Sequence, residues 1–481
     1  MAVSILSKSE KIYKLLKSSF IYGLTSSLQS LLGFVMLPIL TSYYTLEIFG
    51  VYSILLLISA VSSGIFYLGA TSALGRFYFD EVSESYKKKI ITTSIVITLC
   101  GAIILIILGL IFSKLVSFKL FQTELYSFPI LLILIGTALT FLLNIMTLIL
   151  RYENKARIFF LVSIFGVMIN FFITYFLLSR FNFGLLAPIC GLIFSNAICF
   201  IYLIFSKFTY LTNALEASHF KLILSFGLQA SIAGLFYYIL DWVDRIIIKD
   251  LLDLSQVGIY SLGYRLGSIM NILLIMPFSL VWAPMRVEYA KNEDHSSFST
   301  KIISYYTIIG VLILVIAVLF GTEIIQSIFT NKSYHSATKI IPIIMFSMFF
   351  YGYQNIIDFG IYINKKIYYY IIILIIGIFI NVTLNYLFIP IFGFIGAAFV
   401  TLITYMLTST LIYLISNKYY RINIEKNRVF IPLILIPVLY FLVNYISNNM
   451  ILKSIIFISI IISFFKFWLN MNEKKGLKKL F

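Results

Sequence analysis

A few charged side chains lie inside long apolar stretches of this sequence, where they could bind an anion or an ion in transit. Arg265 is the deepest, about nine residues inside its stretch, which is roughly 13 Å along a helix. A charge at the centre of a membrane helix costs about 2.5–3.5 kcal/mol on insertion scales, so it should face protein or water. Because a guanidinium binds phosphate oxygens with two parallel hydrogen bonds, Arg265 is a candidate phosphate ligand. A structural ion pair with Asp241 or Asp358 is the alternative.

Acidic residues near the ends of these stretches could bind a coupling ion or close a gate. Asp241 and Asp244 are three residues apart and therefore share one face of a helix. They could hold an ion near the outer surface, or they could cap the helix and pair locally with Arg245. Asp358 lies toward the inner end of its stretch, where a buried carboxylate could bind H⁺ or Na⁺. A salt bridge at a cytoplasmic gate is the alternative for Asp358.

Other polar side chains could contact a polar or anionic ligand. Arg76, near the inner end of the second stretch, could attract a phosphate or extend toward lipid headgroups. Gln29 and Asn381 interrupt apolar segments, and each buried amide needs a partner, either a neighbouring helix or a hydroxyl group of a ligand. The basic loop Arg151–Arg157 is interpreted as a topology signal instead. Further amides within the stretches are Asn144, Asn170, Gln229 and Asn385.

The elements that must position these residues are the apolar stretches themselves. With 61% hydrophobic and 11% charged residues, a soluble globular protein is excluded. A helix needs about 20 apolar residues to cross a bilayer, and only helices and closed barrels satisfy their backbone groups there. We therefore predict an all-α polytopic membrane protein with about 14 transmembrane helices. The expected spans are residues 18–42, 48–75, 90–113, 125–150, 156–179, 183–206, 221–244, 256–283, 302–321, 338–362, 367–388, 393–416, 429–447 and 451–470.

The distribution of positive charge predicts the orientation of these spans. Most Lys and Arg residues fall in alternate loops, and the positive-inside rule places those loops in the cytoplasm. Both termini are then cytoplasmic, and the expected location is a bacterial cytoplasmic (inner) membrane. The net charge of +17 is explained by this topology, with anionic membrane lipids rather than nucleic acid as the partner.

Two parts of the sequence echo one another and predict an internal repeat. Leu46–Ile54 is similar to Leu254–Leu262, and Asn170 in the fifth span is echoed at nearly the same offset by Asn381 in the eleventh. Because the offset covers an even number of helices, the two halves keep the same orientation, as in a parallel repeat. We predict two six-helix lobes, a cytoplasmic linker and an extra C-terminal helix pair. Their boundaries are 18–206 for the N-lobe, 207–220 for the linker, 221–416 for the C-lobe and 429–470 for the helix pair.

The sequence lacks the residue patterns that an enzyme would need. It has no phosphate-binding lysine loop, its three His residues lie outside the spans, and its three Cys residues show no metal or disulfide spacing. Exterior loops are too short for the domain of a membrane glycosyltransferase or polymerase. We therefore expect no catalytic residue, no metal site and no cofactor. A non-transporting scaffold is a further alternative, which the buried charges disfavour.

Several short segments resemble the signatures of a known family. They run in the expected order from about residue 18 to residue 420. The match is to polysaccharide biosynthesis proteins, and within them to the oligosaccharide flippase (Wzx-type) branch of the multidrug/oligosaccharidyl-lipid/polysaccharide (MOP) exporter superfamily. The segments are Leu37–Thr41 with Leu46–Ser53, Leu74–Glu81, Asp244–Ile248 with Val257–Ser261, and Ile389–Gly393 with Gly396–Ala398.

This resemblance implies a transporter rather than an enzyme. The implied substrate is an oligosaccharide repeat unit on undecaprenyl diphosphate, moved from the cytoplasmic to the outer leaflet by alternating access for O-antigen or capsule synthesis. The polysaccharide polymerase machinery is an implied partner. The resemblance does not decide whether a coupling ion, H⁺ or Na⁺, takes part. The alternative within the superfamily is a cation-coupled multidrug or metabolite exporter, which should carry carboxylates at midplane, where this sequence has Arg265.

Overall fold

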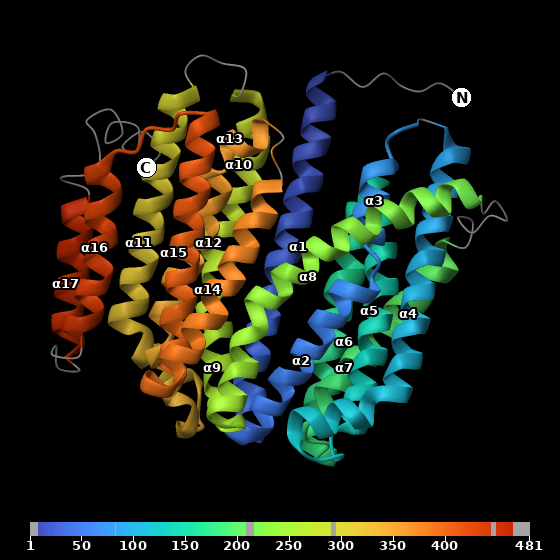
Figure 1. The fold of residues 1–481 in the computed structure, drawn as a ribbon, viewed down its shortest axis with the longest axis horizontal. Helices are drawn as coiled ribbons and strands as arrows, with labels where there is room; N and C mark the ends of the chain where they lie inside the picture. The colour runs from blue at the N-terminus through green and yellow to red at the C-terminus, as the bar shows by residue number, and fades with distance from the viewer. Residues whose placement is uncertain are drawn as a thin grey trace. The chain divides into compact units, whose positions relative to one another are not determined.

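The computed structural model consists of helices, and no strand occurs among the residues that it describes (Figure 1). These residues are 8–81, 83–207, 216–289, 295–364, 366, 368–443 and 449–464, with side chains described from residue 21 onward. The helices are α1 (Lys8–Tyr43), α2 (Leu46–Phe66), α3 (Ala70–Phe77), α4 (Glu84–Phe121), α5 (Ser127–Tyr152), α6 (Ala156–Phe181), α7 (Leu186–Lys207), α8 (Ala217–Leu251), α9 (Leu254–Gly267), η2 (Asn271–Ile275), α10 (Met276–Tyr289), α11 (His295–Ile328), η3 (Lys332–Lys339), α12 (Ile341–Ile357), α13 (Phe359–Ile363), α14 (Tyr368–Phe392), α15 (Phe394–Tyr419), α16 (Lys426–Val443) and α17 (Met450–Ser463).

The predicted all-α polytopic membrane fold is confirmed. Among the described residues, 12 helices are long and apolar enough to cross a membrane, and η3 with α12, bent by 46°, makes up to 13. The last expected span, 451–470, coincides with the shorter apolar helix α17, and its residues 465–470 lie outside the described part of the chain. The chain is thus a multi-pass membrane protein.

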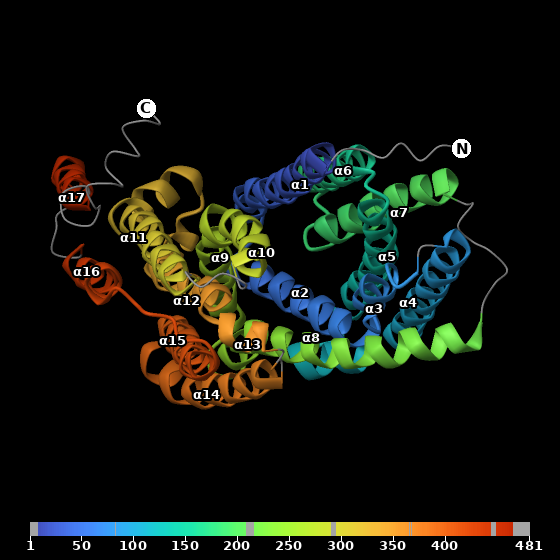
Figure 2. The ribbon, with the colours of Figure 1, turned by 90° about the horizontal axis from the view of Figure 1, so that it is seen from above.

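The chain forms two compact units, Met1–Ile246 and Ile247–Phe481. In the first unit α5 is central, since it packs against α2, α4, α6 and α7, while α1 packs against α6 (Figure 1). In the second unit α15 packs between α12 and α14, and α11 packs against α12, α16 and α17 (Figure 2). The boundary between the two units lies within the helix α8 and reflects how the helices pack. The predicted lobes and the linker between them therefore stay a prediction.

The repeated segments begin helices in the same way. Thr45 precedes α2 and its side chain accepts a hydrogen bond from the amide of Ile48. Asp253 precedes α9 and accepts from the amide of Gln256 at 2.8 Å. Each cap satisfies one of the backbone donors that a helix start leaves unpaired. The similar sequences therefore produce the same local structure.

Three of the expected spans are broken, which their continuous apolar character does not predict. The second span breaks at Leu68 and Gly69, whose φ angles are 53° and 59°. Gly69 lies so close to α8 that a Cβ there would come within 1.9 Å of the Gly227 carbonyl oxygen. The eighth span contains the π-helical turn η2, and the tenth breaks at Asp358 between α12 and α13. Such interruptions in membrane helices are tolerated where neighbouring groups satisfy the backbone.

Candidate functional site

A polar cavity of about 210 Å³ lies within the first unit, among α1, α5, α6 and α7. Its lining combines carboxamides, hydroxyls and one guanidinium in a membrane unit that is otherwise strongly apolar. The amides are Gln29, Asn144, Asn170 and Asn196, the hydroxyl residues are Thr147, Ser163 and Ser195, and the cation is Arg151. No carboxylate lines this cavity. Amide and hydroxyl groups are both donors and acceptors, as sugar hydroxyls require.

The helices position the cavity amides through a small number of contacts. The Gln29 side chain donates to the Ser163 carbonyl oxygen at 3.5 Å, and Asn196 donates to the Thr140 hydroxyl at 2.8 Å. Asn170 accepts from the Thr174 hydroxyl at 3.1 Å. A carboxamide has four hydrogen-bonding positions, so most of the capacity of these groups is left for a ligand.

A glycine allows α7 to approach this wall closely. An added Cβ at Gly191 would lie 2.6 Å from the Asn170 side-chain oxygen and 2.4 Å from the Thr174 hydroxyl. Any larger residue would push Asn170 out of place. The shape of the cavity therefore depends on a residue without a side chain.

Among the described residues Arg151 has no carboxylate partner, in contrast to Arg76 and Arg286. Its guanidinium lies over the Phe159 ring at 4.5 Å, and no ion pair to it occurs among the described residues. By contrast, Arg76 pairs with Asp80 at 2.7 Å and Arg286 pairs with Asp358 at 3.2 Å. A cation that no carboxylate neutralises is suited to an anionic ligand such as a phosphate.

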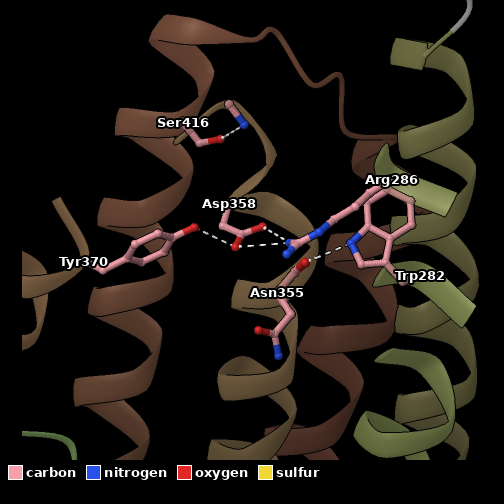
Figure 3. Close-up of polar contacts among 7 residues, drawn as sticks. Trp282, Arg286, Asn355, Asp358, Tyr370 and Ser416 are labelled. Atoms are coloured by element: carbon pink, nitrogen blue, oxygen red, sulfur yellow. Dashed lines mark hydrogen bonds and ion pairs between the residues drawn. The ribbon is translucent and has the colours of Figure 1, made fainter. Parts of the chain in front are cut away.

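A second polar cluster lies in the second unit at the break between α12 and α13 (Figure 3). The Asp358 carboxylate accepts from Arg286 of α10 at 3.2 and 3.4 Å and from the Tyr370 hydroxyl of α14 at 2.6 Å. The Arg286 guanidinium also lies over the Tyr362 ring at 3.7 Å. The two charged side chains are only 16% and 11% exposed. Buried charges of opposite sign need such a pairing, because a lone charge is costly to desolvate.

Further hydrogen bonds hold the helices around this ion pair. The Trp282 indole of α10 donates to the Asn355 carbonyl oxygen at 2.8 Å, just before the break (Figure 3). The Gly360 amide, just after it, donates to the Ser416 hydroxyl of α15 at 2.8 Å. The cluster thus joins α10, α12, α14 and α15, and it is closed rather than open to a ligand.

The predicted site residues fall in different places. Arg265 is exposed near the end of α9, and its side chain makes no hydrogen bond or ion pair in the described part of the chain. Arg76 of α3 is bound to Asp80, which lies just after the end of that helix, and both side chains are largely exposed. Asp241 is half-buried and Asp244 is buried, and the neighbouring Arg245 donates to the Asp241 carbonyl oxygen at 2.7 Å. Their roles as ligands or gate residues stay predictions.

The two predicted amides have different surroundings. Gln29 lines the polar cavity, as described above. Asn381 of α14 is 1% exposed, accepts from Asn385 at 2.9 Å and donates to the Thr404 hydroxyl of α15 at 3.5 Å. For Asn381 the structure provides a neighbouring helix, α15, as the hydrogen-bond partner. A ligand role for Asn381 stays a prediction.

Sequence reasoning missed Arg151, Asn196 and Arg286 as site residues. In the sequence Arg151 belongs to the basic run Arg151–Arg157, whose charges also follow the positive-inside rule, so the pattern carries no separate signal. Asn196 interrupts an apolar span as Gln29 does, and that same signal could have identified it. Arg286 follows the expected end of a span, where a basic residue is ordinary. No group of three or more metal-ligating side chains occurs among the described residues.

Comparison with known proteins points to one family and one fold. The sequence profile of the family described as "Polysaccharide biosynthesis protein" matches residues 15–290. The structure is similar to lipid II flippase MurJ in its inward closed conformation, with a TM-score of 0.74 and 18% identity over 93% of this chain and 98% of that chain. No curated protein matches the sequence.

Two further solved structures have the same fold. An inward-facing multidrug resistance MATE family transporter of the MOP superfamily gives a TM-score of 0.64 at 15% identity, covering 86% of this chain and 96% of that chain. An outward-facing MATE family transporter gives 0.61 at 15% identity, covering 84% and 94%. At these identities the likeness shows the fold alone.

Proposed function

Because this chain belongs to the family of polysaccharide biosynthesis proteins, we propose that it is a flippase for a lipid-linked oligosaccharide. The substrate is an undecaprenyl-diphosphate-linked repeat unit for O-antigen or capsule synthesis. It moves from the cytoplasmic to the outer leaflet of a bacterial inner membrane by alternating access, and its product supplies the polysaccharide polymerase machinery. The observation that carries the proposal is the polar cavity, whose lining has no carboxylate and includes Arg151, a cation with no ion-pair partner among the described residues.

The cavity suits the head of such a substrate. The diphosphate is anionic, and a guanidinium can bind two of its oxygens at once. The sugar hydroxyls need mixed donors and acceptors, which Gln29, Asn170 and Asn196 supply. Under the predicted orientation Arg151 is at the cytoplasmic end of α5, whereas Asn170 and Asn196 lie in the middle parts of α6 and α7. The diphosphate is therefore placed near the cytoplasm and the sugars deeper in the membrane.

The lining also separates this proposal from a cation-coupled drug exporter. A cation prefers carboxylate ligands, and the cavity offers a cation of its own instead. Coupling of transport to H⁺ or Na⁺ through Asp241, Asp244 or Asp358 remains part of the proposal. A direct contact of Arg265 or Arg76 with the diphosphate during transport is likewise a proposal.

The test is flipping of a fluorescent undecaprenyl-diphosphate oligosaccharide in proteoliposomes by wild type, Arg151→Gln and Arg157→Gln. Arg157 belongs to the same basic loop and is exposed, but it does not line the cavity. Hydrogen bonds to a charged group contribute about 1.5–3 kcal/mol, so loss of Arg151 should weaken apparent affinity roughly 10- to 150-fold. Arg157→Gln should behave as wild type.

Two results would count against the proposal in different ways. If Arg151→Gln and wild type flip the substrate equally well, the polar cavity does not bind the diphosphate during transport. If wild type flips no lipid-linked sugar but exports small organic cations, the exporter alternative is correct. Arg151→Lys adds a second check, because it keeps the charge but loses bidentate binding and should fall between the two.

A further inference from the structure

A second cavity, of about 270 Å³, lies in the second unit beside η2, α10 and α11. Its character is opposite to that of the polar cavity, since every residue that lines it is apolar or aromatic. The only polar side-chain atom in the lining is the Trp282 indole nitrogen, which already donates to the Asn355 carbonyl oxygen. A cavity without free polar groups does not hold ordered water, so its natural filling is hydrocarbon.

The cavity connects the exposed surface of the second unit with its interior. Leu273 and Ile309 lie on membrane-spanning segments and are 50% and 49% exposed. Leu274 and Trp282, by contrast, are 3% and 2% exposed and form the inner wall. A hydrocarbon chain in the lipid could therefore enter at the exposed residues and lie against the buried ones.

The cavity is built by the interruption of the eighth span. The π-helical turn η2 ends two residues before Pro277, which lines the cavity, and both features displace a helix from its regular path. The floor is rigid, because Phe278 packs edge-on against Tyr306 at 5.0 Å and the Tyr306 hydroxyl donates to the Phe349 carbonyl oxygen at 3.1 Å. A preformed cavity binds without the entropy loss of ordering its walls.

We propose that this cavity binds a segment of the polyprenyl chain of the transported lipid, an inference that rests on the proposed function. In lipid, one hydrocarbon chain replaces another, so binding depends on packing rather than on exclusion of water. A polyprenyl chain carries regularly spaced methyl branches and double bonds, which fill a wide cavity and contact the Phe278 and Trp282 rings. An unbranched phospholipid chain leaves more of the wall without partner atoms.

The predicted orientation places the cavity in the leaflet where the substrate is collected. Ile302 and Ile309 lie in the first part of α11, which enters the membrane from the cytoplasmic side in that orientation. Trp282 and Met285 lie toward the end of α10, which returns to the same side. The cavity is therefore suited to hold the tail before the head is moved.

Photocrosslinking of the full chain in phospholipid nanodiscs tests occupancy directly. A benzophenone side chain at position 278 replaces one aromatic group by another, and mass spectrometry identifies what it captures. We expect undecaprenyl-diphosphate oligosaccharide to be captured in preference to phospholipid, increasingly as its mole fraction rises. Capture of phospholipid alone, undiminished by added substrate, would overturn the proposal.

A transport comparison tests the same site independently. Ile309→Trp fills the opening of the cavity, whereas Ile316→Trp places the same bulk on the same helix at a 40% exposed position outside it. With the undecaprenyl substrate we expect about a fivefold to tenfold lower flipping rate for Ile309→Trp only, and no loss for either variant with a ten-carbon chain. Equal rates for both variants with the long chain would contradict the inference. If wild type flips neither substrate, the proposed function fails, while the crosslinking result still decides whether the cavity binds polyprenyl.

Discussion

The buried ion pair between Arg286 and Asp358 should stabilise the protein more than an exposed ion pair does. Asp358→Asn keeps the side-chain shape but removes the charge, and leaves Arg286 with the Tyr362 ring. Breaking a buried pair from one side costs about 3–5 kcal/mol, because a desolvated charge is left behind. The side chains are 16% and 11% exposed, and the cation–π contact retains about 1–2 kcal/mol. We therefore expect the free energy of unfolding to fall by about 3 kcal/mol.

The exposed pair between Arg76 and Asp80 is a matched control. Its N–O distance of 2.7 Å is shorter than the 3.2 Å of the buried pair, but its side chains are 55% and 41% exposed. Exposed ion pairs typically contribute only about 0.2–1 kcal/mol. Asp80→Asn should therefore lower the free energy of unfolding only slightly. If the N–O distance set the strength of an ion pair, Asp80→Asn would instead have the larger effect.

The assay is reversible unfolding in mixed micelles by titration with sodium dodecyl sulfate, followed by circular dichroism. The double variant Arg286→Leu with Asp358→Leu should recover most of the loss, since replacing a buried pair by apolar side chains is often neutral. If Asp358→Asn costs no more than Asp80→Asn, the reasoning from burial is wrong. A double variant as unstable as the single one would assign the effect to the Tyr370 hydrogen bond instead of the charge.

Three further predictions concern other parts of the chain. Gly69→Ala should cost several kcal/mol more than Gly184→Ala in the same unfolding assay. Both positions have positive φ, a penalty of about 1–2 kcal/mol, but only at Gly69 does the Cβ meet backbone, whereas nothing lies within 4 Å at Gly184. Lys453→Met removes a 4% exposed partner of Glu323 and should lower stability by about 1.5–3 kcal/mol, and the exchanged pair Lys453→Glu with Glu323→Lys should restore part of it. A hydrogen bond from Lys89, at 2.5 Å, holds the pKa of Glu216 below its usual value, and the His219 ring, whose Nδ1 lies 3.0 Å from the carboxylate, lowers it further. This contact between α4 and the start of α8 is fully present above the usual pKa of about 4.3 and is lost only as pH falls through the lowered value. Amide exchange in the first turn of α8 should therefore be unaffected by the bridge between pH 7 and pH 5, and should increase in Glu216→Gln at either pH.

The local interruptions of the helices show where sequence reasoning fails. Residues 48–75 read as one apolar span, yet Leu68 and Gly69 break it where Gly227 of α8 comes close. The break depends on a contact between residues far apart in the chain. A window of hydropathy reports only the mean character of neighbours, so it cannot detect such a contact.

The candidate sites show the same limit. Gln29 and Asp358 were identified from the sequence, because a polar residue in an apolar span is conspicuous by itself. The residues around them were not identified. Arg286 pairs with Asp358, and Arg151 and Asn196 share a cavity with Gln29, because of which helix faces meet. Arg265, the most conspicuous charge in the sequence, is exposed near the end of α9 and lines neither cavity.

The sequence by itself determined that this protein is an all-α polytopic membrane protein of the polysaccharide biosynthesis family. Both conclusions rest on local properties, since span length follows from bilayer thickness and the family motifs are short runs of residues. Only the tertiary structure decided which polar groups share a cavity, which charges neutralise each other, and where an apolar cavity opens to the surface of the second unit. Those outcomes depend on the rotation of each helix about its axis and on close approaches at Gly69 and Gly191, which are set by packing between distant segments.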